Sequence, residues 1–166
     1  MRGRALSGLF LLTALGCGPW GPMGVVPGGP LLGSEVTEPV RDWSFSDAYP
    51  LIAVETRGRF FRHSVTVLCL SYDGDLYLMA RHAPRKRWVQ EMMRDPRIRM
   101  RIGDTIYPGR AVRVTEPLPD HPVARAFLRK YVALEAEHVR ALPETPGTEE
   151  ERAEVWTFRV TWDGEA

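Results

Sequence analysis

The sequence predicts a mainly β (α+β) domain in which six strands form a closed or nearly closed antiparallel barrel. Three observations support this: six strand-like stretches, turn signals between them, and two helical patterns, a short one between the third and fourth strands and a longer one before the last. A sandwich is less favoured, because the helices would need room outside it. The 166 residues, 44% of them apolar, suffice for one domain with a sizeable core. This composition excludes a disordered chain, and two cysteines are too few for a disulfide scaffold.

The strands are recognised by their periodicity and by the turns that separate them. Asp73-Gly74 is a typical hairpin turn, because both residues tolerate positive φ. Arg97–Ile102 alternates apolar residues with three arginines and predicts a half-buried strand, its arginines facing water or pairing with the acidic residues 149–151. Pro108-Gly109 indicates a bulge or an edge, because proline cannot donate to a ladder. The predicted strands are residues 49–57, 63–72, 76–81, 97–102, 105–116 and 154–162.

Two segments carry helical patterns. Residues 84–95 begin with proline, end before Pro96 and pair apolar residues four positions apart. These are Trp88 with Met92 and Val89 with Met93. Residues 123–142 predict an amphipathic helix followed by an acidic loop over 143–152. The apolar residues of its predicted face are Phe127, Leu128, Tyr131, Val132 and Val139.

The N-terminus has the layout of a secretory signal. Arg2 and Arg4 precede the apolar residues 5–15, which are too few to span a bilayer as a stable helix. Small residues then lead to Cys17, in a pattern similar to the lipobox of bacterial lipoproteins, although Ala14 replaces the usual leucine. The sequence therefore predicts a lipoprotein signal peptide over residues 1–16 and lipidation at Cys17, with an ordinary cleavable signal as the alternative. The protein would be lipid-anchored in the bacterial cell envelope, facing the periplasm or the exterior, with the membrane as a partner.

The remaining chain divides into a predicted tether and the barrel domain. Gly and Pro make up ten of the sixteen residues 18–33, so residues 17–41 are predicted to be a tether and residues 42–166 the barrel domain. Cys69 lies in an apolar run. It is predicted to be a buried free thiol and not a nucleophile, because no residue near it in the sequence would serve as its base.

Basic residues are concentrated in the middle of the chain. Residues 57–113 hold thirteen Lys and Arg against five Asp and Glu, although the formal net charge of the whole chain is only +1. Nucleic acid is discounted as a partner, since the aromatic residues of a stacking platform are missing and an exported protein meets little of it. The histidines lack metal-ligand spacing, so no metal site is predicted.

Residues 76–114 resemble a segment of a known protein family. The stretch LYLMARHAPRKRWVQEMMRDPRIRMRIGDTIYPGRAVRV is similar to one shared by pyridoxamine 5'-phosphate oxidase-like (PNPOx-like) flavoproteins and deazaflavin-dependent nitroreductases. Trp88 followed by Asp95-Pro96 resembles the Trp…Asn-Pro junction of the deazaflavin group. Arg85-Lys86 fall where the oxidase group carries an Arg-Lys pair that holds the flavin phosphate. The resemblance implies a six-stranded antiparallel split β-barrel that forms a homodimer with a cofactor groove between its two barrels.

The resemblance further implies an FMN- or deazaflavin-binding oxidoreductase that reduces a small electron-poor substrate. Such a cofactor carries the reacting centre, so the chain need supply only a phosphate clamp and a dry, flat slot, and no catalytic side chain is predicted. Guanidinium groups suit the clamp, because their fixed donors match phosphate oxygens. The predicted cofactor-binding residues are Arg62, His63, Ser64, Arg85, Lys86, Arg87 and Trp88. Arg57 and Arg59 are candidates to converge on the same anion, and an aromatic residue such as Trp88 is more often a core residue than a cofactor contact.

A noncatalytic function is the alternative. The signal lacks the paired arginines of the route that exports folded proteins, so the chain would cross the membrane unfolded and acquire any cofactor outside. The protein would then be an envelope lipoprotein that binds haem or another planar anionic ligand.

The sequence also departs from the patterns of both cofactor groups. Residues 63–68, HSVTVL, lack the final lysine of the oxidase pattern, and the Gly-x-Lys-Ser-Gly turn of the deazaflavin enzymes is absent near Arg57. The choice between the two cofactors therefore stays open.

Overall fold

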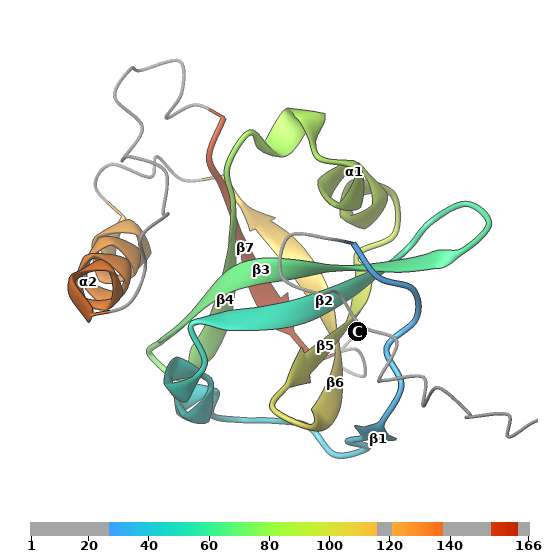
Figure 1. Cartoon of the computed structure of the whole chain (residues 1–166), viewed down its shortest axis with the longest axis horizontal. Coiled ribbons are helices and arrows are strands. Elements are labelled where there is room, and N and C mark those ends of the chain that lie inside the picture. Colours follow the sequence, from blue (N-terminus) through green and yellow to red (C-terminus); the bar gives the residue numbers. More distant parts are fainter. Residues whose placement is uncertain (1–26, 116–120, 138–153, 163–166) are drawn as a thin grey trace, which may run out of the picture.

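The computed structural model describes residues 27–115, 121–137 and 154–162, and within them six strands form a closed antiparallel barrel (Figure 1). Around the barrel, β2 pairs with β5, β5 with β6, β6 with β7, β7 with β4, β4 with β3, and β3 with β2. The strands are β2 (Leu51–Arg57), β3 (Arg62–Tyr72), β4 (Asp75–Ala80), β5 (Arg97–Ile102), β6 (Thr105–Val114) and β7 (Trp156–Thr161). The barrel and the order of strands and helices are those predicted from the sequence.

The barrel interior is filled by alternate residues of the strands. In β5, Ile98, Met100 and Ile102 are buried and the three arginines lie on the outer face, as the alternation predicts. Val54 of β2 and Phe158 of β7 belong to the same buried cluster. Because each strand contributes its apolar face to the interior, the polar face is left to form the outer wall, on which the candidate site is built.

The turns and the proline of β6 follow their residue types. Asp73 (φ 53°) and Gly74 (φ 79°) are both left-handed, which confirms the hairpin predicted between β3 and β4. The ladder between β5 and β6 runs without a bulge through Pro108. On the other edge of β6, the neighbour changes from β1 (Ser34–Glu35), a short parallel strand, to β7. Pro108 lies at this change, where the missing N–H is not needed.

Two short helical segments replace the single helix predicted over residues 84–95. The 3₁₀ segment η2 (Ala83–Arg85) and the helix α1 (Arg87–Arg94) are separated by Lys86, whose backbone is extended. The predicted start of the helix at Pro84 is therefore wrong. Trp88 and its apolar neighbours on α1 pack into the barrel core, but Met93 is 52% exposed and lies outside this packed face.

The helix α2 (Pro122–Glu137) packs on the outside of the barrel against β3 and β4. Phe127 and Tyr131 are buried there, whereas Leu128, predicted for the same face, is 49% exposed.

The Tyr131 hydroxyl accepts a hydrogen bond from the Cys69 N–H at 3.0 Å. Cys69 is a buried free thiol, as predicted, and burial raises its pKa to about 11, which keeps it protonated at neutral pH. The side chains of Val132 and Val139 and the acidic residues 143–152 lie outside the described part. No helix of the described part is both long and apolar enough to cross a bilayer.

Residues 28–36, which we call the N-terminal strap, lie along the barrel wall. Gly28 pairs with Ser64 of β3, and β1 pairs with the start of β6. Leu31 is 1% exposed and packs on Ala53 and Ile106. This part of the segment predicted to be a tether therefore contacts the barrel, because one buried leucine and backbone pairing hold it despite its Gly/Pro content. Residues 1–26, with the predicted signal and Cys17, lie outside the described residues. Beyond the strap, the 3₁₀ segment η1 (Ser44–Ala48) was not predicted; Trp43, just before it, packs into the barrel core.

Candidate functional site: an arginine-lined groove

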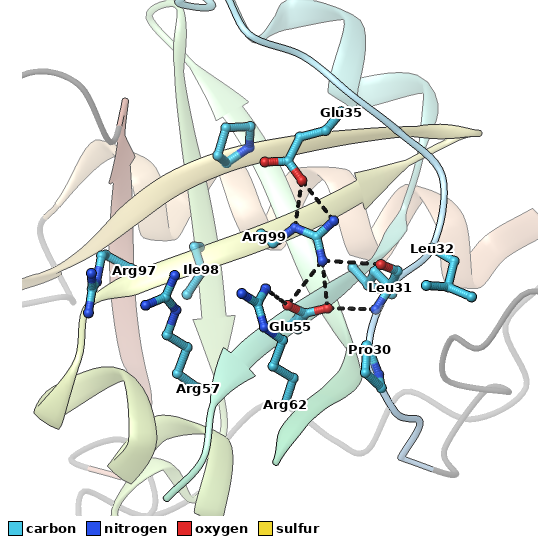
Figure 2. A pocket seen from close by; sticks show the side chains of 11 residues that line it. Pro30, Leu31, Leu32, Glu35, Glu55, Arg57, Arg62, Arg97, Ile98 and Arg99 are labelled. Carbon is cyan, nitrogen blue, oxygen red and sulfur yellow. Dashed lines mark hydrogen bonds and ion pairs between the residues drawn. The ribbon is translucent and has the colours of Figure 1, made fainter. Parts of the chain in front are cut away.

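A groove of about 550 Å³ lies on the outer face of the barrel, between the N-terminal strap and strands β2, β5 and β6 (Figure 2). This volume falls within the range of small-molecule sites. Its lining residues are Pro30, Leu31, Leu32, Glu35, Glu55, Arg57, Arg62, Arg97, Ile98, Arg99 and Pro108. The groove thus combines apolar walls with four guanidinium groups, which we call the arginine groove.

Strand register brings the charged residues of the arginine groove together. Glu55 of β2 lies opposite Arg99 of β5, and Arg57 lies opposite Arg62 across the β2–β3 pair. Arg97 is two residues before Arg99 on the same outer face of β5. Residues that alternate with these on each strand fill the core, so the groove is a direct consequence of the barrel's inside-outside alternation.

Glu55 is the buried centre of this network. The residue is 2% exposed, and its carboxylate accepts hydrogen bonds from the Leu31 N–H (2.6 Å), Arg62 Nη1 (2.6 Å) and Arg99 Nη1 (3.0 Å). Arg99 also pairs with Glu35 of the strap at 2.7 Å. A buried carboxylate is costly unless it is paired and hydrogen-bonded, and here these donors meet that requirement. Arg62 and Arg99 are therefore committed largely to structure.

Arg57 and Arg97 differ from Arg62 and Arg99 in their ion pairs, because neither of them is bound to Glu55. Arg97 donates to both carboxylate oxygens of Asp95, at 2.8 and 2.7 Å. These bonds hold the pKa of Asp95 down to about 2, and the nearby charge of Arg57 contributes. Arg57 forms no ion pair within 4.0 Å among the described residues. The lining holds four arginines against two glutamates, with Asp95 at its edge, so the groove carries a net positive charge.

A second buried carboxylate, Glu91 of α1, lies on the other side of β2 and β3. It is 4% exposed and accepts hydrogen bonds from the Thr56 hydroxyl (2.6 Å) and Arg87 Nε (2.8 Å), with His63 Nδ1 at 3.1 Å. Burial pushes the pKa of Glu91 upward, but the hydrogen bonds from Thr56, Arg87 and His63 outweigh it and leave the pKa below its ordinary value. This cluster fastens α1 to the base of the β2–β3 hairpin.

The structure distributes the seven residues predicted to bind a cofactor over several different environments. Arg62 lines the arginine groove, and the Ser64 hydroxyl donates to the carbonyl of Gly29 at 2.7 Å. His63 and Arg87 share Glu91. The Arg85 side chain is 76% exposed and pairs with Glu154 at 3.0 Å.

The last two predicted residues lie at the start of α1. Lys86 is exposed at the N-cap of the helix, and Trp88 is 7% exposed and packs on Phe158 in the core. Of the seven predicted residues, Arg62 alone lines the arginine groove. Arg97 and Arg99 were missed as site residues, although the strict alternation of β5 already placed them on one face. Within the described part, no three His, Cys, Asp or Glu side chains gather into a possible metal site.

No protein-family model matches the sequence, and none of the curated proteins is detectably similar to it. Solved structures do resemble the fold. A putative 5-nitroimidazole antibiotic resistance protein from Bacteroides thetaiotaomicron aligns with a TM-score of 0.53 at 12% identity, covering 77% of this chain and 81% of that protein. An FAD-binding protein from Mesorhizobium loti aligns with a TM-score of 0.48 at 15% identity, covering 71% and 84%. A putative pyridoxamine 5'-phosphate oxidase from Listeria innocua aligns with a TM-score of 0.46 at 13% identity, covering 71% and 87%.

These comparisons concern the fold. The chain has the mainly β split-barrel fold, and the Bacteroides thetaiotaomicron protein resembles this fold at a TM-score of 0.53. At 12% identity the likeness does not extend to individual site residues. Any function must therefore be argued from the arginine groove itself.

Proposed function

We propose that the arginine groove binds the phosphate-bearing end of a flat cofactor, FMN or a deazaflavin, and that the protein is an oxidoreductase that reduces a small electron-poor substrate. The supporting observation is a net positive groove with apolar walls on the outer face of a split barrel. Proteins with a fold of this kind have several activities, so the proposal rests on the residues of the groove and not on the fold.

The charges of the groove suit a phosphate monoester. Such a group carries about −1.5 to −2 charges near neutral pH and accepts paired donors from a guanidinium fork. Arg57, which forms no ion pair among the described residues, and Arg97, at the same end of the groove in Figure 2, would hold it. Arg62 and Arg99 would add charge while remaining bound to Glu55.

The walls of the groove suit a flat ring. Leu32, Pro30 and Pro108 offer apolar surface beside the arginines, so an apolar ring system would lie against carbon while its charged end meets donors. The cofactor, when bound, supplies hydride-transfer chemistry. The residues of this chain would bind it, orient it and exclude water. Arg85, Lys86 and Arg87 do not line the groove, so we assign the phosphate to Arg57 and Arg97 instead.

A titration of the full chain tests this proposal. The protein is titrated with FMN, a deazaflavin and haem, and binding is followed by absorbance and fluorescence. Arg57→Gln should weaken binding of the phosphate-bearing cofactor about tenfold or more, because a charge-assisted hydrogen bond contributes about 1.5–3 kcal/mol. The matched control Arg85→Gln removes an equal charge outside the groove and should leave affinity unchanged.

Each other outcome is informative. Weakening by Arg85→Gln alone would move the site to the residues predicted from the sequence. Binding of haem alone would support the noncatalytic alternative, and binding of none of the three would refute the cofactor proposal. Reduction of a nitroaromatic probe by the loaded protein with a nicotinamide donor separates an oxidoreductase from a binding protein.

The lipid anchor, the envelope location and the homodimer are further proposals that rest on the sequence. Labelled fatty acid should enter the intact protein and should not enter Cys17→Ala, because the cysteine is the predicted attachment site. Labelling that survives this change would contradict lipidation at Cys17. Sedimentation equilibrium of the lipid-free protein tests the dimer.

A further inference from the structure

The β2–β3 hairpin ends in an exposed tip with the sequence Arg-Gly-Arg-Phe-Phe-Arg, residues 57–62, which we call the Arg-Phe tip. Phe60 is 79% exposed and Phe61 is 78% exposed, whereas the next most exposed large apolar side chain in the described part, Leu32, is 56% exposed. Figure 1 shows this hairpin projecting beyond the barrel. Single exposed apolar residues are ordinary on protein surfaces. Two adjacent phenylalanines at the end of a projecting hairpin require another explanation.

The tip is held in place by the Glu91 cluster. The Gly58 N–H donates to the Phe61 carbonyl at 3.1 Å, which closes the turn. A Cβ atom at Gly58 would lie 2.6 Å from that carbonyl oxygen and 2.9 Å from Glu91 Oε1, so only glycine fits between the turn and the cluster. Thr56 and His63, on either side of the turn, also contact Glu91. The hairpin therefore presents its two phenylalanines outward from a fixed base.

Positive charge surrounds the phenylalanines. The tip holds Arg57, Arg59 and Arg62, and the sequence contains no acidic residue between Glu55 and Asp73. The Arg59 guanidinium lies over the Phe60 ring, 5.5 Å from its centroid. Apolar rings with flanking arginines are the composition of segments that sit at the boundary of lipid headgroups and acyl chains.

The size of the apolar surface favours a bilayer over a protein partner. Each phenylalanine offers on the order of 150–250 Å². Two of them supply roughly half of the ~800 Å² that each partner contributes to a standard protein interface. A bilayer needs no matching surface, because each ring is buried in lipid independently.

The strap joins the hairpin at its base. Gly28 bridges Ser64, two residues after Arg62. Cys17 precedes Gly28 by eleven residues in the sequence, a separation that spans at most about 40 Å when extended. A membrane surface that held the predicted anchor would therefore lie within reach of the Arg-Phe tip.

We infer that the Arg-Phe tip docks on the surface of an anionic lipid bilayer. Phe60 and Phe61 enter the headgroup boundary, and Arg59, which does not line the arginine groove, contacts lipid phosphates. This docking does not depend on a cofactor in the arginine groove.

Vesicle binding of the full chain, carrying Cys17→Ala so that no lipid is attached, tests the inference. Vesicles of phosphatidylcholine alone are compared with vesicles of equal parts phosphatidylcholine and phosphatidylglycerol. Phe60→Ser with Phe61→Ser should weaken binding to the anionic vesicles about tenfold for each ring. The control Leu128→Gln, an exposed apolar side chain on α2, should bind like the parent protein.

A second measurement reports on the tip itself, whatever the N-terminal residues do. Phe60→Trp places an indole at the tip, and anionic vesicles with brominated acyl chains should quench the added fluorescence relative to the parent protein. Absence of this quenching, or equal binding by the double serine variant, would overturn the inference. So would a double variant that loses self-association in sedimentation while its vesicle binding is unchanged, because the tip would then be a contact between copies.

Discussion

Two buried carboxylates lie on opposite faces of strand β2. Glu55 is a residue of the strand, and Glu91 contacts the residue that follows it, Thr56. Glu55 belongs to β2 and points to the outer face, where Arg62, Arg99 and the Leu31 N–H surround it. Glu91 comes from α1 and meets Thr56, the next residue of β2, on the inner face. One carboxylate fastens the strap and builds the arginine groove, and the other fastens a helix and fixes the Arg-Phe tip. The comparison shows how successive residues of a barrel strand can organise two separate surfaces.

The partners of the two carboxylates differ in kind. Glu55 is held by two guanidinium groups, which stay charged throughout the accessible pH range, and by a backbone N–H. Glu91 is held by a hydroxyl, one guanidinium and the imidazole of His63. We therefore expect Glu55 to carry the larger electrostatic contribution, because its loss leaves two arginines without their shared acceptor.

The largest effect is expected for Glu55→Gln. Removing one partner of a buried ion pair leaves the other charges uncompensated, and we expect a loss of about 3 kcal/mol in the free energy of unfolding, measured by urea denaturation. Amide exchange of strap residues 28–36 should accelerate in the same variant, because the Leu31 N–H loses a charged acceptor. The control Glu35→Gln removes the exposed partner of Arg99 and should cost under about 1 kcal/mol. Equal losses in the two variants would contradict this view of Glu55.

A smaller effect is expected for Glu91→Gln. The variant weakens the bonds from Thr56, His63 and Arg87 but leaves an amide oxygen in place, so about 2 kcal/mol of stability should be lost. The strap should keep its amide protection, whereas the amide of Gly58 at the hairpin tip should exchange faster. If the strap were exposed as well, the two carboxylates would not act on separate surfaces. Arg87→Gln, whose side chain is 71% exposed, is the milder control.

The sequence predicted the fold better than the site because the two depend on contacts of different range. Strand alternation and the Asp73-Gly74 turn are local, so the barrel could be assigned from neighbouring residues. Arg99 is fixed by Glu55 and Glu35, which lie 44 and 64 residues away in the sequence. No local sequence pattern predicts ion pairs between residues so far apart in the sequence. The strap was predicted as a tether because composition alone does not reveal that Leu31 is buried.

The predicted phosphate clamp depends on tertiary structure in the same way. Arg85 and Lys86 are neighbours in the sequence and were expected to act together at a helix start. The extended backbone at Lys86 ends one helical segment and begins another, and Glu154 holds the Arg85 side chain. Adjacent basic residues converge on one anion only where the backbone and the competing carboxylates allow it, and both are tertiary properties.

The smallest effect on stability is expected at Asp95. This residue follows the helix that carries Glu91 and pairs with Arg97 of the arginine groove, so it connects the two regions compared above. Its pKa is about 2, below the ordinary value, chiefly through the hydrogen bonds from Arg97. A lowered pKa in the folded state stabilises the fold at pH above the unfolded value of about 3.9, and this contribution is lost as pH falls toward 2. Asp95→Asn should therefore flatten the pH dependence of stability in that window by about 1 kcal/mol or less, since the pair is partly exposed.

The same substitution also bears on the groove. Asp95→Asn removes the carboxylate charge that competes with a bound phosphate for Arg97 Nε and Nη2, so it should tighten cofactor binding a few-fold while Arg57→Gln weakens it. The control Asp75→Asn removes a comparable ion pair with Arg159 and should leave affinity unchanged, because neither residue lines the groove. Unchanged affinity in Asp95→Asn would mean that Arg97 does not contact the ligand. Arg57 would then hold the phosphate without Arg97. Asp95 and Arg97, which follow α1, would take no part in ligand binding.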